Sequence, residues 1–379
     1  MQHRLAITGI FALNGAVFSA WYARLPAIQD GLGLTPGQIG IALLGAPLGL
    51  LLAQPATGAI VARRGSRPLV AAAPLYLLAC VLPALAVDLP TLVLAVFVAG
   101  AANGVLDISM NANGLALERR SGRRLFSSLH AAFSFGALGG AAAAGAFAAL
   151  GVGPVAHLLA WSGAGAIVAL VLVSQLLADA PAARAPRRTR PRARPSRRLL
   201  TLSAIAFCVL LAEGAVFDWS GIFLAREAGA SQGAAALGLA LFSLTMGIGR
   251  LGGDAAAARI GAPALARGGA AIAAAGLALA AIVTTTPVAL AGFALMGIGL
   301  SVVFPLTLRS AGRDSTHELA AVSAIGYTGF LAGPPLIGLL AELGDLRSAL
   351  ALAISACAVA ALLATALRET PAATAAGAG

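Results

Sequence analysis

Charged side chains are scarce in this sequence of 379 residues. Aspartate, glutamate, lysine and arginine together make up 10% of it, whereas soluble domains carry about 25%. Hydrophobic residues reach 59%, and the mean hydropathy is +0.92. This composition excludes an ordinary soluble globular protein and predicts an integral membrane protein.

Cysteine is also rare. Cys80, Cys208 and Cys357 each stand alone inside an apolar stretch, which fits side-chain packing and not a disulfide or metal framework. The short polar segments contain no cofactor-binding loop and no spacing typical of a catalytic triad. We therefore expect no enzymatic activity, no cofactor and no metal ion.

Long apolar stretches recur along the chain, and each is long enough for a helix of about 20 residues to cross the hydrocarbon core of a bilayer. Helix-start signals support several of them: residues 35–38 (TPGQ) form a capping box with proline at the first helical position, and Thr286 with Pro287 repeats the cap and proline. The pattern predicts twelve membrane-spanning helices, near residues 5–22, 37–61, 69–87, 90–115, 126–150, 155–178, 199–224, 235–257, 269–284, 287–308, 320–341 and 347–367.

Lysine is absent, and all 25 basic residues are arginine, which gives a net charge of +11. The arginines stand in short blocks between the predicted spans, so they do not indicate a nucleic-acid partner. One set of loops and termini holds 21 of them, whereas the opposite loops hold only Arg24, Arg226 and Arg347, and Arg250 lies near the inner end of the eighth span. Because positive residues are retained in the cytoplasm, both termini are predicted to be cytoplasmic.

The sequence also repeats itself. Residues 14–18 (NGAVF) in the first span return as 213–217 (EGAVF) in the seventh, at an offset of 199, and Trp21 has a near counterpart in Trp219. Residues 63–65 after the second span match 259–261 after the eighth, at an offset of 196. Two landmarks at nearly equal offsets are harder to attribute to chance than either alone.

The repeat predicts an all-α membrane protein of two six-helix halves that run in parallel and are related by an axis along the membrane normal. The predicted segments are an N-terminal half at 1–178, a cytoplasmic linker rich in arginine and proline at 179–198, a C-terminal half at 199–367 and a cytoplasmic tail at 368–379.

Residues 58–67 (GAIVARRGSR) resemble the signature loop between the second and third spans of the major facilitator superfamily. The signature has aspartate where this chain has Ala62, so of the signature's Asp-Arg gating pair only Arg63 is present. Further motifs resemble the bacterial MosC/YbjJ-like branch, which is related to fucose permeases: residues 107–111 (DISMN), Glu213 with 218–220 (DWS), 249–254 (GRLGGD) and 326–335 (GYTGFLAGPP).

The resemblance covers nearly the whole chain and implies the major facilitator fold in a bacterial cytoplasmic (inner) membrane. That branch includes a transporter of an inositol-derived rhizopine beside members of unknown substrate, so it implies a small polar solute, sugar-like or cyclitol-like. Proton-driven drug exporters of the superfamily carry an arginine midway along span four, where this chain has Gly100, and a Gly-Pro motif in span five, which has no proline here. Uptake is therefore favoured over export.

Ionisable residues inside spans are the first candidates for function, because a charge at the centre of a membrane helix costs roughly 2.5–3.5 kcal/mol on insertion scales. Glu213 lies fourteen residues into its predicted span, about 21 Å along the helix and slightly beyond the midplane. We expect it to bind solute or exchange a proton, or else to be a protonated group bonded between helices. The resemblance implies that spans one, four, seven and ten line a cavity, across which its repeat partner Asn14 should face it.

A second polar group lies in the fourth span. Asn103, Asp107 and Asn111 recur every four residues and therefore form one stripe on an otherwise apolar helix. Asp107 lies towards the cytoplasmic end, so a structural or gating role is as reasonable as solute contact. Gly100 and Gly104 near that face permit close packing or a ligand.

Several other residues have two interpretations. Arg250 and Asp254 are four apart on one helical face and are predicted to pair as a cytoplasmic gate or brace. His130 shares a face with Ser134 and either reaches the cavity or donates a hydrogen bond between helices. The three tryptophans fit aromatic belts at the membrane interface, and Trp21 and Trp219 alternatively stack on a sugar face. Gly136 and Gly140 are predicted packing residues.

These features predict a secondary transporter that moves a small polar solute by alternating access, coupled to protons and functional as a monomer in the bilayer. The alternatives are a proton-driven exporter, a membrane solute sensor that does not transport, and a channel.

Overall fold

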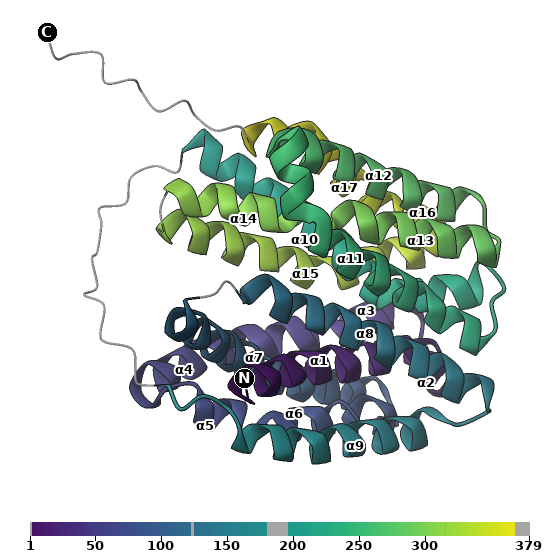
Figure 1. Cartoon of the computed structure of the whole chain (residues 1–379). Helices are drawn as coiled ribbons and strands as arrows, with labels where there is room; N and C mark the ends of the chain where they lie inside the picture. The colour runs from purple at the N-terminus through teal and green to yellow at the C-terminus, as the bar shows by residue number, and fades with distance from the viewer. Residues whose placement is uncertain (1, 123–124, 180–195, 315, 368–379) are drawn as a thin grey trace, which may run out of the picture.

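The computed structural model describes residues 2–122, 125–179, 196–314 and 316–367, and almost all of them are helical (Figure 1). Within these residues, twelve segments are long and apolar enough to cross a membrane, which confirms the number of predicted spans. In the first half they are α1 (Gln2–Ala23) with α2 (Leu25–Leu32), α3 (Pro36–Leu43) with α4 (Gly45–Arg64), α5 (Arg67–Val70) with α6 (Ala73–Ala79) and η1 (Leu82–Leu85), α7 (Leu89–Ser121), α8 (Phe126–Ala149) and α9 (Pro154–Ser174).

The second half follows the same plan. Its spans are α10 (Arg197–Arg226), α11 (Gln232–Ile260), α12 (Ala262–Ile282), α13 (Thr286–Leu300) with α14 (Val303–Asp314), α15 (Thr316–Leu343), and α16 (Leu346–Ala349) with α17 (Ala351–Leu363) and η2 (Ala364–Leu367). In Figure 1 the two halves lie one above the other, the first from purple to teal and the second from teal to yellow.

The packing inside the first half recurs in the second. Within the first half α1 packs on α8, α4 on α7 and α6 on α9, and within the second half α10 packs on α15, α11 on α13 and α12 on α17 in the same order. In both halves the first span therefore contacts the fifth, the second contacts the fourth and the third contacts the sixth. This recurrence confirms the two pseudo-symmetric halves expected from the sequence repeat.

Glycines bring the helices of the first half close together, as expected in a membrane, where no hydrophobic effect drives helices together. A Cβ atom at Gly136 or Gly140 of α8 would collide with backbone carbonyl oxygens of α1. Gly100 and Gly104 of α7 approach the backbone of α4 in the same way, so the structure assigns them to helix packing and leaves no room there for a ligand.

The predicted helix starts are partly right. Thr35 and Gln38 form the expected capping box at the start of α3. The prediction for Thr286 was wrong: it is the first residue of α13 and not the cap, and its hydroxyl donates to the carbonyl oxygen of Ala228 at 2.9 Å. A cap that the sequence analysis did not identify starts the last span, where the amide of Ser348 donates to Asp345 at 2.7 Å and keeps the pKa of this exposed carboxyl below its ordinary value.

The first span is longer than predicted, and Arg24 is not in a loop. The helix turns at Arg24 and continues as α2 to Leu32, which leaves the arginine 4% exposed. Its guanidinium donates to the carbonyl oxygen of Ala144, in the last two turns of α8, at 3.4 Å and to that of Val152, three residues beyond the end of this helix. Carbonyl groups at a helix C-terminus carry partial negative charge, which explains how this cation is accommodated.

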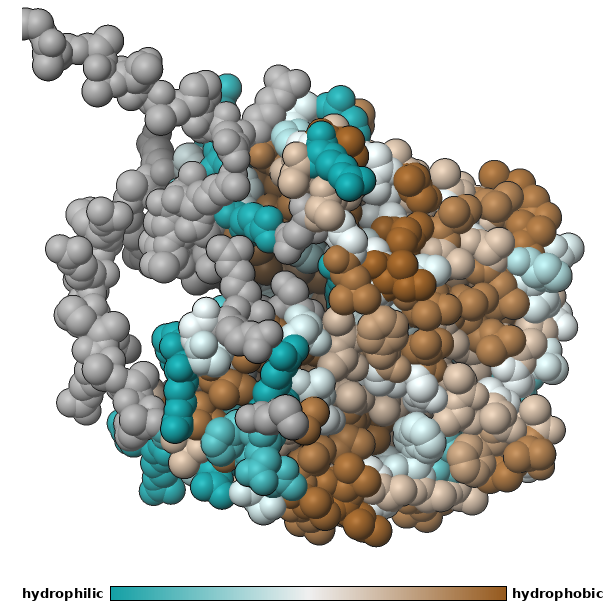
Figure 2. Space-filling model, viewed as in Figure 1, coloured by the Kyte–Doolittle hydropathy of each residue, from teal (hydrophilic) through white to brown (hydrophobic). Residues whose placement is uncertain are grey.

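The two ends of the bundle differ in charge and in how the halves meet. We call the end that holds Arg63, Arg64, Arg119 and Arg120 the arginine face, and the other end the opposite face; α1 begins and η2 ends at the arginine face. Figure 2 shows hydrophilic residues gathered at the arginine face and apolar residues over the flank of the bundle, as expected for a flank that contacts lipid.

The halves are in contact towards the opposite face and apart towards the arginine face. α3 packs extensively on α15, whereas α4, which continues the same span towards the arginine face, barely touches it. The structure is therefore open towards the arginine face and closed towards the opposite face.

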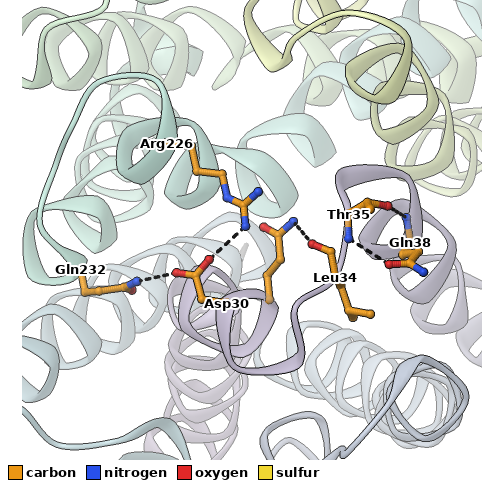
Figure 3. Close-up of polar contacts among 7 residues, drawn as sticks. Asp30, Leu34, Thr35, Gln38, Arg226 and Gln232 are labelled. Carbon is orange, nitrogen blue, oxygen red and sulfur yellow. Dashed lines mark hydrogen bonds and ion pairs between the residues drawn. The ribbon is translucent and has the colours of Figure 1, made fainter.

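Polar contacts tie the halves together at the opposite face (Figure 3). Asp30 at the end of α2 accepts from Arg226 at 3.0 Å and from Gln232 at 3.3 Å, both of the second half. The carboxylate of Glu342 accepts from the backbone amide of Gly37 at 2.9 Å. These contacts join residues of different halves, so separating the halves at this face would break them.

Candidate functional site between the two halves

A layer of aromatic rings ends the opening on its inner side. Phe18 of the first half meets Phe217 of the second edge to face, with ring centroids 5.4 Å apart. Tyr22 and Phe242 add further contacts to Phe217 at 6.2 and 5.9 Å. Phe18 and Phe217 are the last residues of the two NGAVF/EGAVF repeats, so the sequence repeat meets itself between the halves.

Glu213 lies one helical turn from this layer, on the side of the arginine face. Its Oε1 is 3.5 Å from Nη2 of Arg250 in α11, and the two side chains are only 13% and 21% exposed. Nη1 of Arg250 donates to the hydroxyl oxygen of Ser134 in α8 at 3.0 Å, and Ser134 in turn donates to the carbonyl oxygen of His130. Arg250 therefore joins a carboxylate of its own half to a hydroxyl of the other half.

Two residues of the polar stripe predicted on α7 contact each other. The amide nitrogen of Asn111 donates to Oδ1 of Asp107 at 3.0 Å and to its backbone carbonyl at 2.8 Å, which confirms that these two residues share a face. Asn103 lies one turn further along, and its buried Oδ1 has no hydrogen-bond partner among the described residues. Asn111 thus holds one oxygen of Asp107 in place.

The site includes a residue that the sequence analysis did not select. Tyr327 of α15 precedes Pro334 by about two helical turns and so shares its face, on which the backbone of Pro334 packs against Gly40 of α3 in the first half. Its only sequence signal is its place in the GYTGFLAGPP motif, which carries no chemistry of its own. Contacts between side chains thus join α10, α11 and α8 across the two halves, and Tyr327 lies on the face of α15 that is turned towards the first half.

Comparison with known proteins decides the family. The profile of the Major Facilitator Superfamily matches residues 6–328. The chain belongs to this superfamily. Its members are transporters and not enzymes, so this chain is a secondary transporter with twelve membrane spans.

Similar proteins support the branch as well. An uncharacterized MFS-type transporter of Yersinia pestis is 32% identical over 355 residues, which cover 89% of each chain. The membrane protein MosC of Rhizobium meliloti is 31% identical over 355 residues, which cover 92% of this chain and 86% of MosC. The resemblance to MosC inferred from sequence motifs is thereby confirmed.

Solved structures of the superfamily share the fold. A point mutant of the nucleoside transporter NupG has a TM-score of 0.74 at 12% identity, over 97% of this chain and all of NupG. A point mutant of the Escherichia coli fucose:proton symporter FucP has a TM-score of 0.66 at 16% identity, over 97% of this chain and 98% of FucP. At these identities the likeness shows the fold alone.

The superfamily's signature loop is held here by a different carboxylate. Ala62 stands where the signature has aspartate, and Arg63 is exposed at the arginine face without an ion pair among the described residues. The carboxylate of Asp179, after the sixth span, instead accepts from the backbone amides of Ser66 at 2.9 Å and Arg67 at 3.2 Å. The loop is thus tied to the end of the sixth span through its backbone.

Three other candidates were predicted at the cavity or the gate: Asn14, His130 and Asp254. Asn14 is buried, and its amide donates to the sulfur of Met110 at 3.6 Å, so it packs inside the first half in this conformation. His130 lies edge to face on Phe11 with ring centroids 5.4 Å apart. The side chain of Asp254 lies outside the described residues, and the described partner of Arg250 is Glu213.

The assignment of Trp21 and Trp219 to an aromatic belt was wrong, because both side chains are buried in the protein core. Trp21 stacks on Tyr22 at a centroid distance of 3.9 Å. In this conformation neither ring is exposed to lipid or to solute. Among the described residues, no group of three or more histidine, cysteine, aspartate or glutamate side chains is placed to hold a metal ion.

Proposed function

We propose that this protein takes up a small polar solute, sugar-like or cyclitol-like, by alternating access coupled to protons. The arginine face is then cytoplasmic, because the positive-inside rule places the loops that carry most of the arginines there. The conformation described above is accordingly inward-open in a bacterial inner membrane. A single chain contains both halves of the site, so a monomer suffices.

The observation that carries the coupling proposal is the link from Glu213 through Arg250 to Ser134. At 3.5 Å and an effective dielectric constant of 20, the direct attraction in the ion pair is about 5 kcal/mol, before desolvation is subtracted. Protonation of Glu213 removes this attraction and releases Arg250 from its carboxylate. Because Arg250 also bonds to the other half, the charge on Glu213 affects how the two halves are held together.

Relatives agree with the solute class and the driving ion. FucP is named a fucose:proton symporter, and NupG is named a nucleoside transporter. Both names describe small polar solutes with several hydroxyl groups. Gly100 packs on α4 at the position where drug exporters of the superfamily carry an arginine, which supports uptake over export.

The decisive experiment compares Glu213→Gln with the wild-type protein in proteoliposomes. Wild-type protein is expected to accumulate solute when a proton gradient is imposed, and to exchange labelled for unlabelled solute without one. Glu213→Gln is expected to keep exchange and lose accumulation, because the amide keeps the shape of the site but cannot carry a proton.

Glu227→Gln is the matched control, since Glu227 follows the same helix at the opposite face, outside the site. It should behave as the wild-type protein. Proton-driven accumulation by Glu213→Gln at the wild-type level would show that another group couples protons. Failure of the wild-type protein to exchange any sugar, cyclitol or nucleoside would instead favour a solute sensor.

Topology is tested independently of transport. In a cysteine-free background, a cysteine in place of the exposed Arg120 should react with an impermeant maleimide only after the cells are opened. A cysteine in place of the exposed Val87, at the opposite face, should react in intact cells. The reverse pattern would place the arginine face outside the cell.

A further inference from the structure

A small pocket opens at the arginine face of the second half, where the eighth, ninth and twelfth spans meet. It has a volume of about 270 Å³ and is lined by Ile260, Pro263, Ala264, Arg267 and Thr365. Ile260 ends α11, the next three residues belong to the first two turns of α12, and Thr365 belongs to η2 at the end of the last span. The pocket therefore lies at the edge of the predicted membrane-spanning region.

The pocket is on the outer side of the second half. α12 and α17 pack on each other and on helices of their own half, and neither packs extensively on the first half. In Figure 1 both helices lie on the side of the second half that is turned away from the first. Ile260, at the mouth of the pocket, is 59% exposed. The pocket is thus separate from the opening between the halves and lies at the level of the lipid headgroups.

The pocket carries a positive charge without a described counter-charge. Arg267 is exposed and makes no ion pair or hydrogen bond with the described residues. None of the described residues that line the pocket is acidic. A guanidinium presents several N–H donors in a geometry that matches a phosphate group.

The corresponding place in the first half is filled by an anionic group of the chain itself. Gly65 and Gly261, the matching glycines of the repeat, have φ angles of 76° and 83°, so the two loops turn in the same way. In the first half the carboxylate of Asp179 accepts from the backbone amides of Ser66 and Arg67, where the second, third and sixth spans end or begin. The eighth, ninth and twelfth spans are the counterparts of these three. The fold therefore holds an anion at this place in one of its two halves.

The donors at this place differ in the second half. At the repeat offset of 196, Pro263 corresponds to Arg67, and proline has no backbone amide to donate. Arg267 follows Pro263 by four residues, so the two share a face of α12, and both line the pocket. The guanidinium thus supplies donors where the backbone has lost one.

We propose that this pocket binds the phosphate group of an anionic phospholipid, with Arg267 as its main donor. The volume suits a headgroup, and the exposed apolar side chains of Ile260 and Ala264 border the path along which the acyl chains leave. A bound phosphate joins the ends of three spans in the second half, as the carboxylate of Asp179 does in the first. The site is independent of the transported solute.

Binding is tested with the full-length protein in detergent micelles, by thermal unfolding and native mass spectrometry. Phosphatidylglycerol should raise the unfolding temperature in a saturable way and remain bound in the mass spectrum. Phosphatidylcholine, whose headgroup has no net charge, should bind more weakly. Inorganic phosphate and glycerol 3-phosphate test whether the phosphate group suffices without the acyl chains, and both should bind more weakly than phosphatidylglycerol.

Arg267→Gln should weaken the affinity for phosphatidylglycerol about tenfold or more, the loss expected for a hydrogen bond to a charged group. Arg120→Gln is the matched control, because it removes one exposed arginine from the same face in the other half. It should bind phosphatidylglycerol as the wild-type protein does. An equal loss in both variants would show general attraction to the arginine face and overturn the pocket as a site.

Two further outcomes would also overturn the proposal. Inorganic phosphate that binds as tightly as phosphatidylglycerol would make a free phosphate, and not a lipid, the ligand. The other concerns Glu369, whose side chain lies outside the described residues: residues 367–369 (LRE) match 177–179 (LAD), so Glu369 corresponds to Asp179. If Glu369→Gln and Arg267→Gln lower the unfolding temperature equally without lipid, and the wild-type protein gains nothing from phosphatidylglycerol, the chain's own carboxylate is the partner of Arg267.

Discussion

Replacing Phe217 by leucine should shift this transporter from the conformation described here towards one that opens at the opposite face. Leucine keeps an apolar side chain at this position but removes the ring. Phe217 makes two aromatic contacts with the other half, to Phe18 at 5.4 Å and to Tyr22 at 6.2 Å, and these are lost when the halves separate at this level. Its contact with Phe242 lies within one half and remains in both conformations.

The size of the shift follows from the number of contacts between the halves. An aromatic pair contributes about 0.5–1.5 kcal/mol beyond the area that it buries. Two such pairs amount to about 1–3 kcal/mol, which corresponds to a change of about 5- to 150-fold in the ratio of the two conformations.

The assay is a distance distribution between spin labels on the two halves at the opposite face. Leu150 and Leu343 are exposed there, one in each half, so cysteines at these positions should accept labels without disturbing the core. In the Phe217→Leu background the population with the longer distance should increase by the factor given above.

Phe223→Leu serves as the control. Phe223 lies on the same helix and meets Phe293 edge to face at 6.1 Å, but both residues belong to the second half. This variant should lose stability without changing the label distances. If Phe223→Leu and Phe217→Leu gave the same distances, the aromatic layer would not be what holds the opposite face closed.

Two further predictions concern contacts between helices. Asp30→Asn removes the ion pair with Arg226, in which both side chains are roughly half exposed. It should shift the equilibrium between the two conformations by less than about 1 kcal/mol, seen in the same label distances, and the shift should disappear in 1 M salt. A shift that persists in 1 M salt would contradict this. Gly140→Ala should lower the thermal unfolding temperature in detergent, because its Cβ would collide with the carbonyl oxygen of Ala16 at a cost of about 1–3 kcal/mol. Gly139→Ala is the control: its Cβ would have open space, so the unfolding temperature should stay unchanged.

The sequence predicted the architecture because every membrane-spanning segment must be apolar along its own length. Each crossing needs about 20 apolar residues, and each glycine that lets two helices touch is a local feature of one helix. The repeat at an offset of 199 then related the two halves without any knowledge of their contacts.

The sequence was less informative where a residue's partner lies far away in the chain. It assigned Arg250 to a partner four residues away, and it could not indicate that the described structure brings Glu213 and Ser134 to this arginine from two other helices. It placed Arg24 in a loop because a lone arginine at the end of an apolar run usually marks one, and the carbonyl groups that accept from it lie more than 100 residues further on.

The sequence by itself determined that this chain crosses the membrane twelve times in two related halves, and that a few polar residues are buried among apolar ones. Periodicity and hydropathy depend only on residues that are close in the sequence, so both can be recognised without knowledge of the fold. Only the tertiary structure decided which of those polar residues meet. It brought Arg250 to Glu213 and Ser134 and set Phe18 against Phe217, because contacts between helices depend on how two halves pack and on which face of the membrane they are closed.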